Sequence, residues 1–77
     1  MPRRTRADPV SRKLGDAIRK AREGRGETLD QVAHRIPRMD AKYLGEIERG
    51  WHSPTIPTAK RIADALETRL SELFKGL

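Results

Sequence analysis

Side chains that can form hydrogen bonds dominate a short segment over residues 40–49. In it Lys42 can donate and Glu46 can accept, whereas Leu44 and Ile47 are the only strong apolar anchors. Because these two anchors are three residues apart, they fall on one narrow stripe of a helix and leave the remaining circumference outside. Such a helix suits insertion into a DNA groove, although an ordinary solvent-facing helix has a similar pattern.

Residues that could support catalysis or metal binding are sparse. The chain has two histidines, His34 and His52, which lack metal-ligand spacing, and it has no cysteine. No glycine-rich phosphate loop follows a strand, and no nucleophile stands beside a base. We therefore predict no enzyme activity, no metal site and no cofactor. We also expect His34 on the exposed side of its helix.

The positive charge is concentrated near the N-terminus. Seventeen Lys and Arg residues face eleven Asp and Glu residues, which gives a net charge of +6. This excess suits a polyanionic partner such as nucleic acid. Residues 1–13 hold five basic side chains against Asp8 alone, a net +4. We predict a flexible basic arm over residues 1–10, in which Arg3, Arg4 and Arg6 wrap a duplex or enter a minor groove; a solubilising tail is the alternative.

Length and hydropathy bound the remaining possibilities. The 77 residues suffice for one compact domain of marginal stability, which a partner subunit would help. The apolar runs are too short to span a membrane, and none follows the basic N-terminus as a secretory signal requires. The absence of cysteine fits a reducing compartment. We expect a cytoplasmic protein without membrane contact.

A helical repeat organises the apolar residues. They recur at i, i+3, i+4 and i+7 in four segments, which begin at Leu14, Leu29, Ala59 and Leu70. No segment alternates with period two. Together with the 40–49 segment, this spacing predicts an all-α, five-helix domain over residues 11–77.

Capping and helix-breaking residues separate these segments. Asp, Ser and Thr cap helix N-termini, whereas Gly and Pro end helices. The predicted start signals are Asp8-Pro9 or Ser11, then Thr28, Asp40, Thr55 and Thr68, and the predicted ends are Gly24, Ile36 before Pro37, and Gly50.

The order of motifs resembles a known family. The segment from Leu14 to Phe74 is similar to the Cro/phage-repressor type of helix-turn-helix domain, the XRE family. The resemblance rests on Ile18-x-x-x-Arg22, Thr28–Ala33, Tyr43–Gly50, Ser53–Ile56 with Ile62–Leu66, and Leu70–Phe74. It implies a compact lambda repressor-like bundle, a recognition helix over 40–49, and an ion pair between Arg22 and Glu48.

Three features depart from the family pattern. The turn at Pro37-Arg38 is one residue longer than the usual single glycine. Leu29 stands where many members have a glutamine that contacts DNA. The sequence Glu67-Thr68-Arg69 replaces a Gly-Val-Ser-like turn. The hinge, one DNA contact and the last corner should therefore differ.

The resemblance implies two sets of DNA contacts. The base-reading residues would be Ala41 toward a thymine methyl, Lys42 toward guanine or a phosphate, Tyr43, and Glu46 toward cytosine N4. Phosphate contacts would come from the start of the second helix and the flank of the recognition helix. They comprise Thr28, Gln31, Arg38, Arg49, Trp51, His52 and Lys60, although Trp51 could instead cover the edge of the core.

The last apolar stripe suggests a second copy of the chain as partner. Leu70, Leu73, Phe74 and Leu77 would form a two-fold interface, or pack back onto the domain. The sequence thus predicts a homodimeric transcription regulator, a repressor or controller of phage or restriction-modification type, on a pseudo-palindromic double-stranded operator. The alternatives are an antitoxin that binds a toxin and its own operator, and a nucleic-acid-binding protein without sequence preference.

Overall fold

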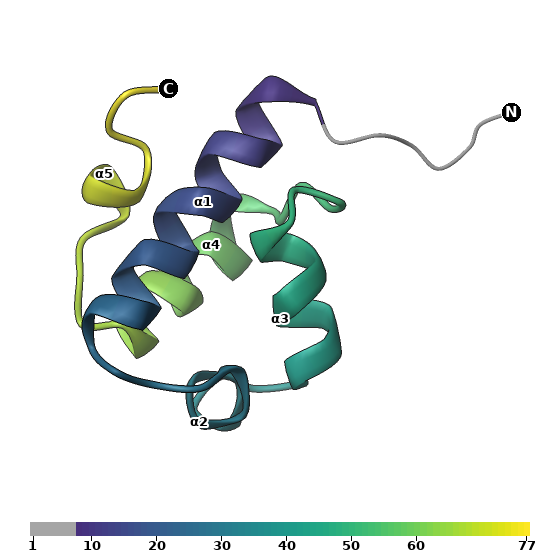
Figure 1. The fold of residues 1–77 in the computed structure, drawn as a ribbon, viewed down its shortest axis with the longest axis vertical. Coiled ribbons are helices and arrows are strands. Elements are labelled where there is room, and N and C mark those ends of the chain that lie inside the picture. Colours follow the sequence, from purple (N-terminus) through teal and green to yellow (C-terminus); the bar gives the residue numbers. More distant parts are fainter. Residues whose placement is uncertain (1–7) are drawn as a thin grey trace, which may run out of the picture.

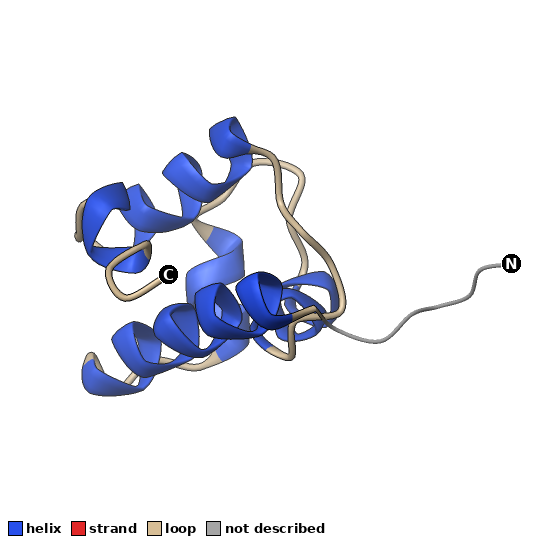
Figure 2. Cartoon of the chain, turned by 90° about the horizontal axis from the view of Figure 1, so that it is seen from above, coloured by secondary structure: helices blue, strands red, loops and turns tan. Residues whose placement is uncertain are grey.

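Five helices form the part of the chain that the computed structural model describes, residues 8–77. They are α1 (Pro9–Gly24), α2 (Leu29–His34), α3 (Ala41–Glu48), α4 (Ile56–Ala65) and α5 (Leu70–Leu73). Figure 2 shows only helices and loops over this range. The predicted all-α architecture is therefore confirmed. Arg3, Arg4 and Arg6 of the predicted arm lie outside the described residues.

Side-chain caps define most of the helix starts. Asp8 accepts the Ser11 N–H at 2.8 Å, so α1 starts at the first of the two predicted sites. Thr28, Asp40 and Thr55 cap α2, α3 and α4 as predicted. Each cap satisfies one backbone N–H that lacks a partner inside its helix.

Two boundary predictions are wrong. Thr68 does not cap α5, because the helix begins at Leu70 and Arg69 therefore takes the N-cap position, without a side-chain bond. The Thr68 N–H belongs to the end of α4, where it donates to the Ala63 carbonyl at 2.9 Å. The second helix ends at His34 rather than Ile36, since the Ile36 N–H has already turned to the Ala33 carbonyl at 3.0 Å. Pro37 disfavours the helical conformation only at the preceding residue, Ile36, whereas the helix ends two residues before that, at His34.

Residues in the left-handed conformation follow the ends of α1, α3 and α4, and another lies in the turn between α2 and α3. Gly26 and Gly50 follow α1 and α3 with φ of 70° and 80°. At two of the three departures from the family pattern, the left-handed residues are not glycine: Arg38 has φ 61° and Glu67 has φ 56°. A side chain in this conformation costs about 1–2 kcal/mol. The chain accepts this cost at both corners.

The third helix, α3, packs against α1 and α2 (Figure 1), and the core that these helices enclose also includes side chains of α4 and α5. Its largest fully buried side chains are Ile18, Val32, Leu44, Ile47 and Ile62, all 0% exposed. Leu44 and Ile47 are the two anchors expected on the narrow stripe of α3. On the other side, α5 packs on α4 and α1. The recognition-helix candidate is thus held by a small apolar contact.

Main-chain atoms of α1 and α3 meet directly beside this core. A Cβ built on Gly15 would lie 2.5 Å from the Glu48 carbonyl oxygen, closer than real Cβ atoms approach. A Cβ on Gly50 would lie 2.9 Å from the Arg12 Cα. Only glycine permits these approaches, so both positions fix the distance between the helices.

No helix in residues 8–77 has both the length and the apolar character needed to cross a lipid bilayer.

Candidate nucleic-acid interface

The outward side of α3 carries most of the predicted base-reading residues. Lys42 has 85% of its side chain exposed, and Tyr43 is 38% exposed. Ala41 is half-buried at the first turn. Only 17% of the Glu46 side chain is exposed. Lys42 and Glu46, one turn apart, share one side of the helix, but the four residues differ in how exposed they are.

Glu46 is bonded on both sides. Its carboxylate contacts His52 Nε2 at 2.8 Å and Lys42 Nζ at 3.3 Å. The His52 hydrogen bond, followed by the Lys42 ammonium, lowers the pKa of Glu46 below its ordinary value. The His52 ring also lies 4.9 Å from the Tyr43 ring, centre to centre. Glu46 therefore stays ionised and links the helix to the loop that follows it.

A bidentate ion pair joins α1 to the end of α3. Arg22 Nε and Nη2 donate to the two Glu48 carboxylate oxygens at 2.7 and 2.9 Å. The two side chains are 13% and 5% exposed, so water screens the pair little. Arg22 Nη1 also donates to the Glu27 carbonyl at 2.8 Å. The pairing that the family resemblance implied is present, and it also holds the α1–α2 loop.

The start of α2 is closed by a capping box. Thr28 Oγ1 accepts the Gln31 N–H at 3.1 Å, and Gln31 Oε1 accepts the Thr28 N–H at 2.8 Å. Only the carbonyl oxygen of the Gln31 amide is engaged in this box. Its NH₂ group is the donor that faces solvent, the chemistry a phosphate oxygen needs.

The remaining phosphate candidates differ in how free they are. The Arg49 guanidinium stacks on the Trp51 ring at 4.6 Å, and Trp51 is 55% exposed. More than half of Trp51 is therefore accessible beside Arg49, whichever of its two predicted roles it has. Lys60 pairs with Asp64 at 2.6 Å on the exposed side of α4. Arg38 is exposed at the hinge.

The predicted dimer residues are mostly used within the chain. Leu73 is 2% exposed in the core, and Leu70 and Phe74 pack partly buried against it. The stripe breaks because α5 ends at Leu73 and Phe74 is already its C-cap. Only Leu77 is exposed, at 45%. The expectation that Leu73 lies between two subunits is therefore corrected.

Several residues that shape this face were missed in the sequence. Gly15 sits inside α1, where glycine costs about 1 kcal/mol of helix stability relative to alanine. That cost was the available signal for a close helix crossing. Ser11, 3% exposed, forms a hydrogen bond with Ser53, which lies 42 residues further along the chain. No spacing rule links two serines so far apart in the chain.

Comparisons with known proteins agree with this geometry. A family model described as helix-turn-helix, HTH_3, matches residues 18–73. The HTH-type transcriptional regulator SlrR of Bacillus subtilis is 36% identical over 62 residues, 79% of this chain and 40% of SlrR. The transcriptional regulator ClgR of Mycobacterium tuberculosis is 40% identical over 58 residues, 75% of this chain and 51% of ClgR. The chain thus spans about half or less of these relatives.

A solved structure extends the match to the fold. The restriction-modification controller protein C.AhdI of Aeromonas hydrophila superposes with a TM-score of 0.77 at 28% identity, covering 83% of this chain and 96% of that one. The fold and its exposed third helix define a helix-turn-helix protein. This chain belongs to the HTH_3 helix-turn-helix family.

Proposed function

We propose that this chain binds double-stranded DNA sequence-specifically as a transcription regulator, with α3 in the major groove. The observation that carries the proposal is the division of α3: Leu44 and Ile47 are fully buried, whereas Lys42 on the opposite side is 85% exposed. A helix anchored in this way presents hydrogen-bonding groups to base edges without unfolding. The printed descriptions of SlrR and ClgR as transcriptional regulators support it.

Lys42 is the principal base-reading residue in this proposal. Its ammonium has three donors, of which Glu46 accepts one, so two remain for guanine O6 and N7. Glu46, with free lone pairs on its ionised carboxylate, accepts from cytosine N4. Ala41 contacts a thymine methyl, and Tyr43 borders the same surface.

Phosphates on both sides of α3 would hold the helix in register. On one side Thr28 and Gln31 present the α2 N-terminus and the free amide donors of Gln31. On the other side Arg49 is aligned on Trp51, whose indole N–H is a further donor. Arg38, His52 and Lys60 complete the predicted contacts, together with Arg3, Arg4 and Arg6 of the arm.

Two copies of the chain would read a pseudo-palindrome. Two-fold symmetry sets their α3 helices about 34 Å apart, one turn of B-DNA. The likeness to C.AhdI supports a controller protein of restriction-modification type.

Selection from a pool of random duplexes at moderate salt tests the function. We expect enrichment of an inverted repeat whose half-sites lie one helical turn apart. Lys42→Ala should relax the preference at one position of each half-site, at a cost of about 1–3 kcal/mol. Lys75→Ala, which removes the same charge after α5, is the control and should select the wild-type motif. Enrichment of no sequence would reject the function, and an unchanged motif for Lys42→Ala would reject its role.

A further inference from the structure

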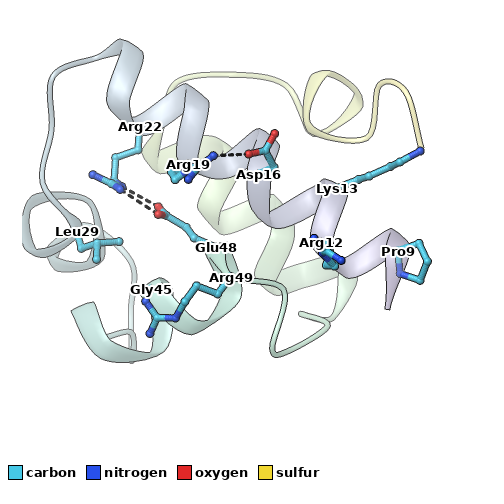
Figure 3. Close-up of a pocket in the computed structure, with 10 residues that line it drawn as sticks. All are labelled: Pro9, Arg12, Lys13, Asp16, Arg19, Arg22, Leu29, Gly45, Glu48 and Arg49. Atoms are coloured by element: carbon cyan, nitrogen blue, oxygen red, sulfur yellow. Dashed lines mark hydrogen bonds and ion pairs between the residues drawn. The ribbon is translucent and has the colours of Figure 1, made fainter. Parts of the chain in front are cut away.

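An open groove of about 750 Å³ runs between α1 and α3. Figure 3 shows α1 side chains along one wall, and Leu29, Gly45 and Arg49 along the other. Its far end is at Pro9, where α1 begins. The groove therefore starts beside the proposed base-reading face and runs toward the N-terminal end of α1.

The groove has a positive charge that its own carboxylates do not cancel. Asp16 pairs with Arg19 at 2.6 Å, and Glu48 pairs with Arg22. Within residues 8–77, three further cations of the lining have no carboxylate within 4.0 Å: Arg12, Lys13 and Arg49. A ligand in the groove therefore meets a net charge of +3.

One of these three cations, Arg49, is held in position by a side-chain contact, and a second, Arg12, has the base of its side chain packed against Gly50, just after α3. The Arg12 main chain and Cγ pack against Gly50, where a Cβ would lie 2.9 Å from each of Arg12 Cα and Cγ. The Arg49 guanidinium is stacked on Trp51. Lys13 is exposed on the α1 wall. Cations fixed before binding lose less conformational entropy when an anion arrives.

We propose that this groove binds the phosphodiester backbone of the same duplex that α3 reads, through Arg12 and Lys13 of α1. The inference rests on the proposed function, because the groove shares Gly45 and Arg49 with the outward side of α3. A backbone phosphate near Arg49 then has its neighbours along the strand opposite the α1 wall. The apolar surface of Leu29 and Pro9 suits the sugar carbons between phosphates.

The double variant Arg12→Gln/Lys13→Gln tests the groove on the selected duplex. Each lost phosphate contact should reduce the slope of log K against log salt by about 0.9, so we expect a reduction of about 2. The selected sequence should stay the same, because phosphate contacts carry no base information. Single phosphates of the duplex can also be replaced by uncharged methylphosphonates. At the phosphates that the groove contacts, this replacement should weaken binding of the wild type but not of the Arg12→Gln/Lys13→Gln variant.

The matched control is Lys20→Gln/Lys75→Gln. It removes the same net charge from side chains that pair with Asp16 and Glu72 and do not line the groove. An unchanged slope for the groove variant, or an equal reduction in both variants, would overturn the proposal, and capture of an acidic protein by the groove in place of DNA would do so too. If Arg12→Gln weakens folding, Lys13→Gln alone should still reduce the slope by about 0.9.

The two proposals fail in different ways. Loss of sequence preference in the selection rejects the proposed function, yet the groove contacts remain measurable as a salt slope on random duplex. A normal selected motif with no slope difference between the two variants rejects the groove alone.

Discussion

At the scale of single residues, the Arg22–Glu48 pair connects stability to the binding face. Both ends of the guanidinium fork are used, toward Glu48 and toward the Glu27 carbonyl. Glu48 directly precedes Arg49, which lines the groove. The pair therefore holds the C-terminal end of α3 against α1.

Removing one partner of this pair should be costly. Glu48→Ala leaves a nearly buried guanidinium without its counter-charge, and we expect a loss of about 3 kcal/mol in the free energy of unfolding. The double variant Arg22→Met/Glu48→Leu fills the same space with apolar groups, and should fall within about 1 kcal/mol of wild type. Urea unfolding of wild type, single and double variants measures both. Equal losses in the single and double variants would contradict this account.

Glu27 should make the free energy of unfolding depend on pH in the acid range. Its carboxylate accepts from Arg35 at 2.6 Å and from Arg25 at 2.8 Å, and these bonds lower its pKa from 4.5 to about 2. Because the folded pKa lies below the unfolded one, the stabilisation is fully present above about pH 4.5 and is lost as pH falls toward 2. Glu27→Gln should flatten the decline of Tm across this window, with little difference from wild type below it. A wild-type decline that the substitution leaves unchanged would assign the effect to other carboxylates.

At the scale of elements, the corner between α4 and α5 carries backbone strain. Glu67 has φ 56°, and its N–H and that of Thr68 donate to Asp64 and Ala63 as they would behind a glycine. Glu67→Gly should raise the free energy of unfolding by about 0.5–1 kcal/mol, the gain from a relaxed backbone less the greater entropy of the unfolded glycine. The Tm should rise by roughly 2–8 °C.

Glu67→Ala separates the backbone from the side chain. It also removes the exposed contact with Arg25 at 3.4 Å but keeps a Cβ in the left-handed conformation. We expect no stabilisation from it. A gain equal to that of glycine would show that the carboxylate, not the conformation, was unfavourable.

The elements themselves were mostly predictable because they depend on local chemistry. Period 3.6 located the helices, and the caps at Thr28, Asp40 and Thr55 follow from one side chain and a nearby N–H. The failures are tertiary. Thr68 is a favourable N-cap residue by type, but it belongs to the turn that ends α4, where its N–H donates to the Ala63 carbonyl, and α5 begins only at Leu70. The α1–α3 groove depends on the approach at Gly15, for which a helical pattern offers only a weak signal.

The side-chain partners of the site were less predictable than its location. The spacing of Lys42 and Glu46 permits their contact within one helix, whereas the bond from Glu46 to His52 depends on how the chain turns after Gly50. The burial of Leu73 likewise depends on where α5 ends. Sequence thus located the outward face of α3 but not its hydrogen bonds.

At the scale of the whole molecule, the proposed dimer decides how long a DNA site the protein would read. One copy presents a single short α3, whereas two copies would present both halves of a repeat. Because Leu73 is already buried in its own core, a two-fold contact near α5 has Leu77 as its exposed apolar residue.

We therefore expect the chain to sediment as a dimer of the 8.8 kDa subunit at micromolar concentration. Leu77→Asp should shift it toward monomer, because a carboxylate would be desolvated in the contact. Ile56→Asp places the same charge on another exposed aliphatic residue, 60% exposed at the start of α4, and should leave the dimer intact. If both the Leu77→Asp and the Ile56→Asp variants remain dimeric, the interface does not include Leu77. A monomeric wild type would contradict dimerisation.

The backbone contact at Gly15 makes the orientation of α3 independent of how the side chains of the interior pack. Where side chains space two helices, repacking them tilts one helix relative to the other. Here α1 and α3 are in contact through Gly15 and main-chain carbonyl oxygens of α3. Removal of a buried methyl group elsewhere, as in Ile18→Val, should therefore leave the tilt of α3 unchanged. Under the proposed function, substitutions in the interior can therefore accumulate without altering which bases are recognised, and new specificities can arise on α3 without changes in the interior.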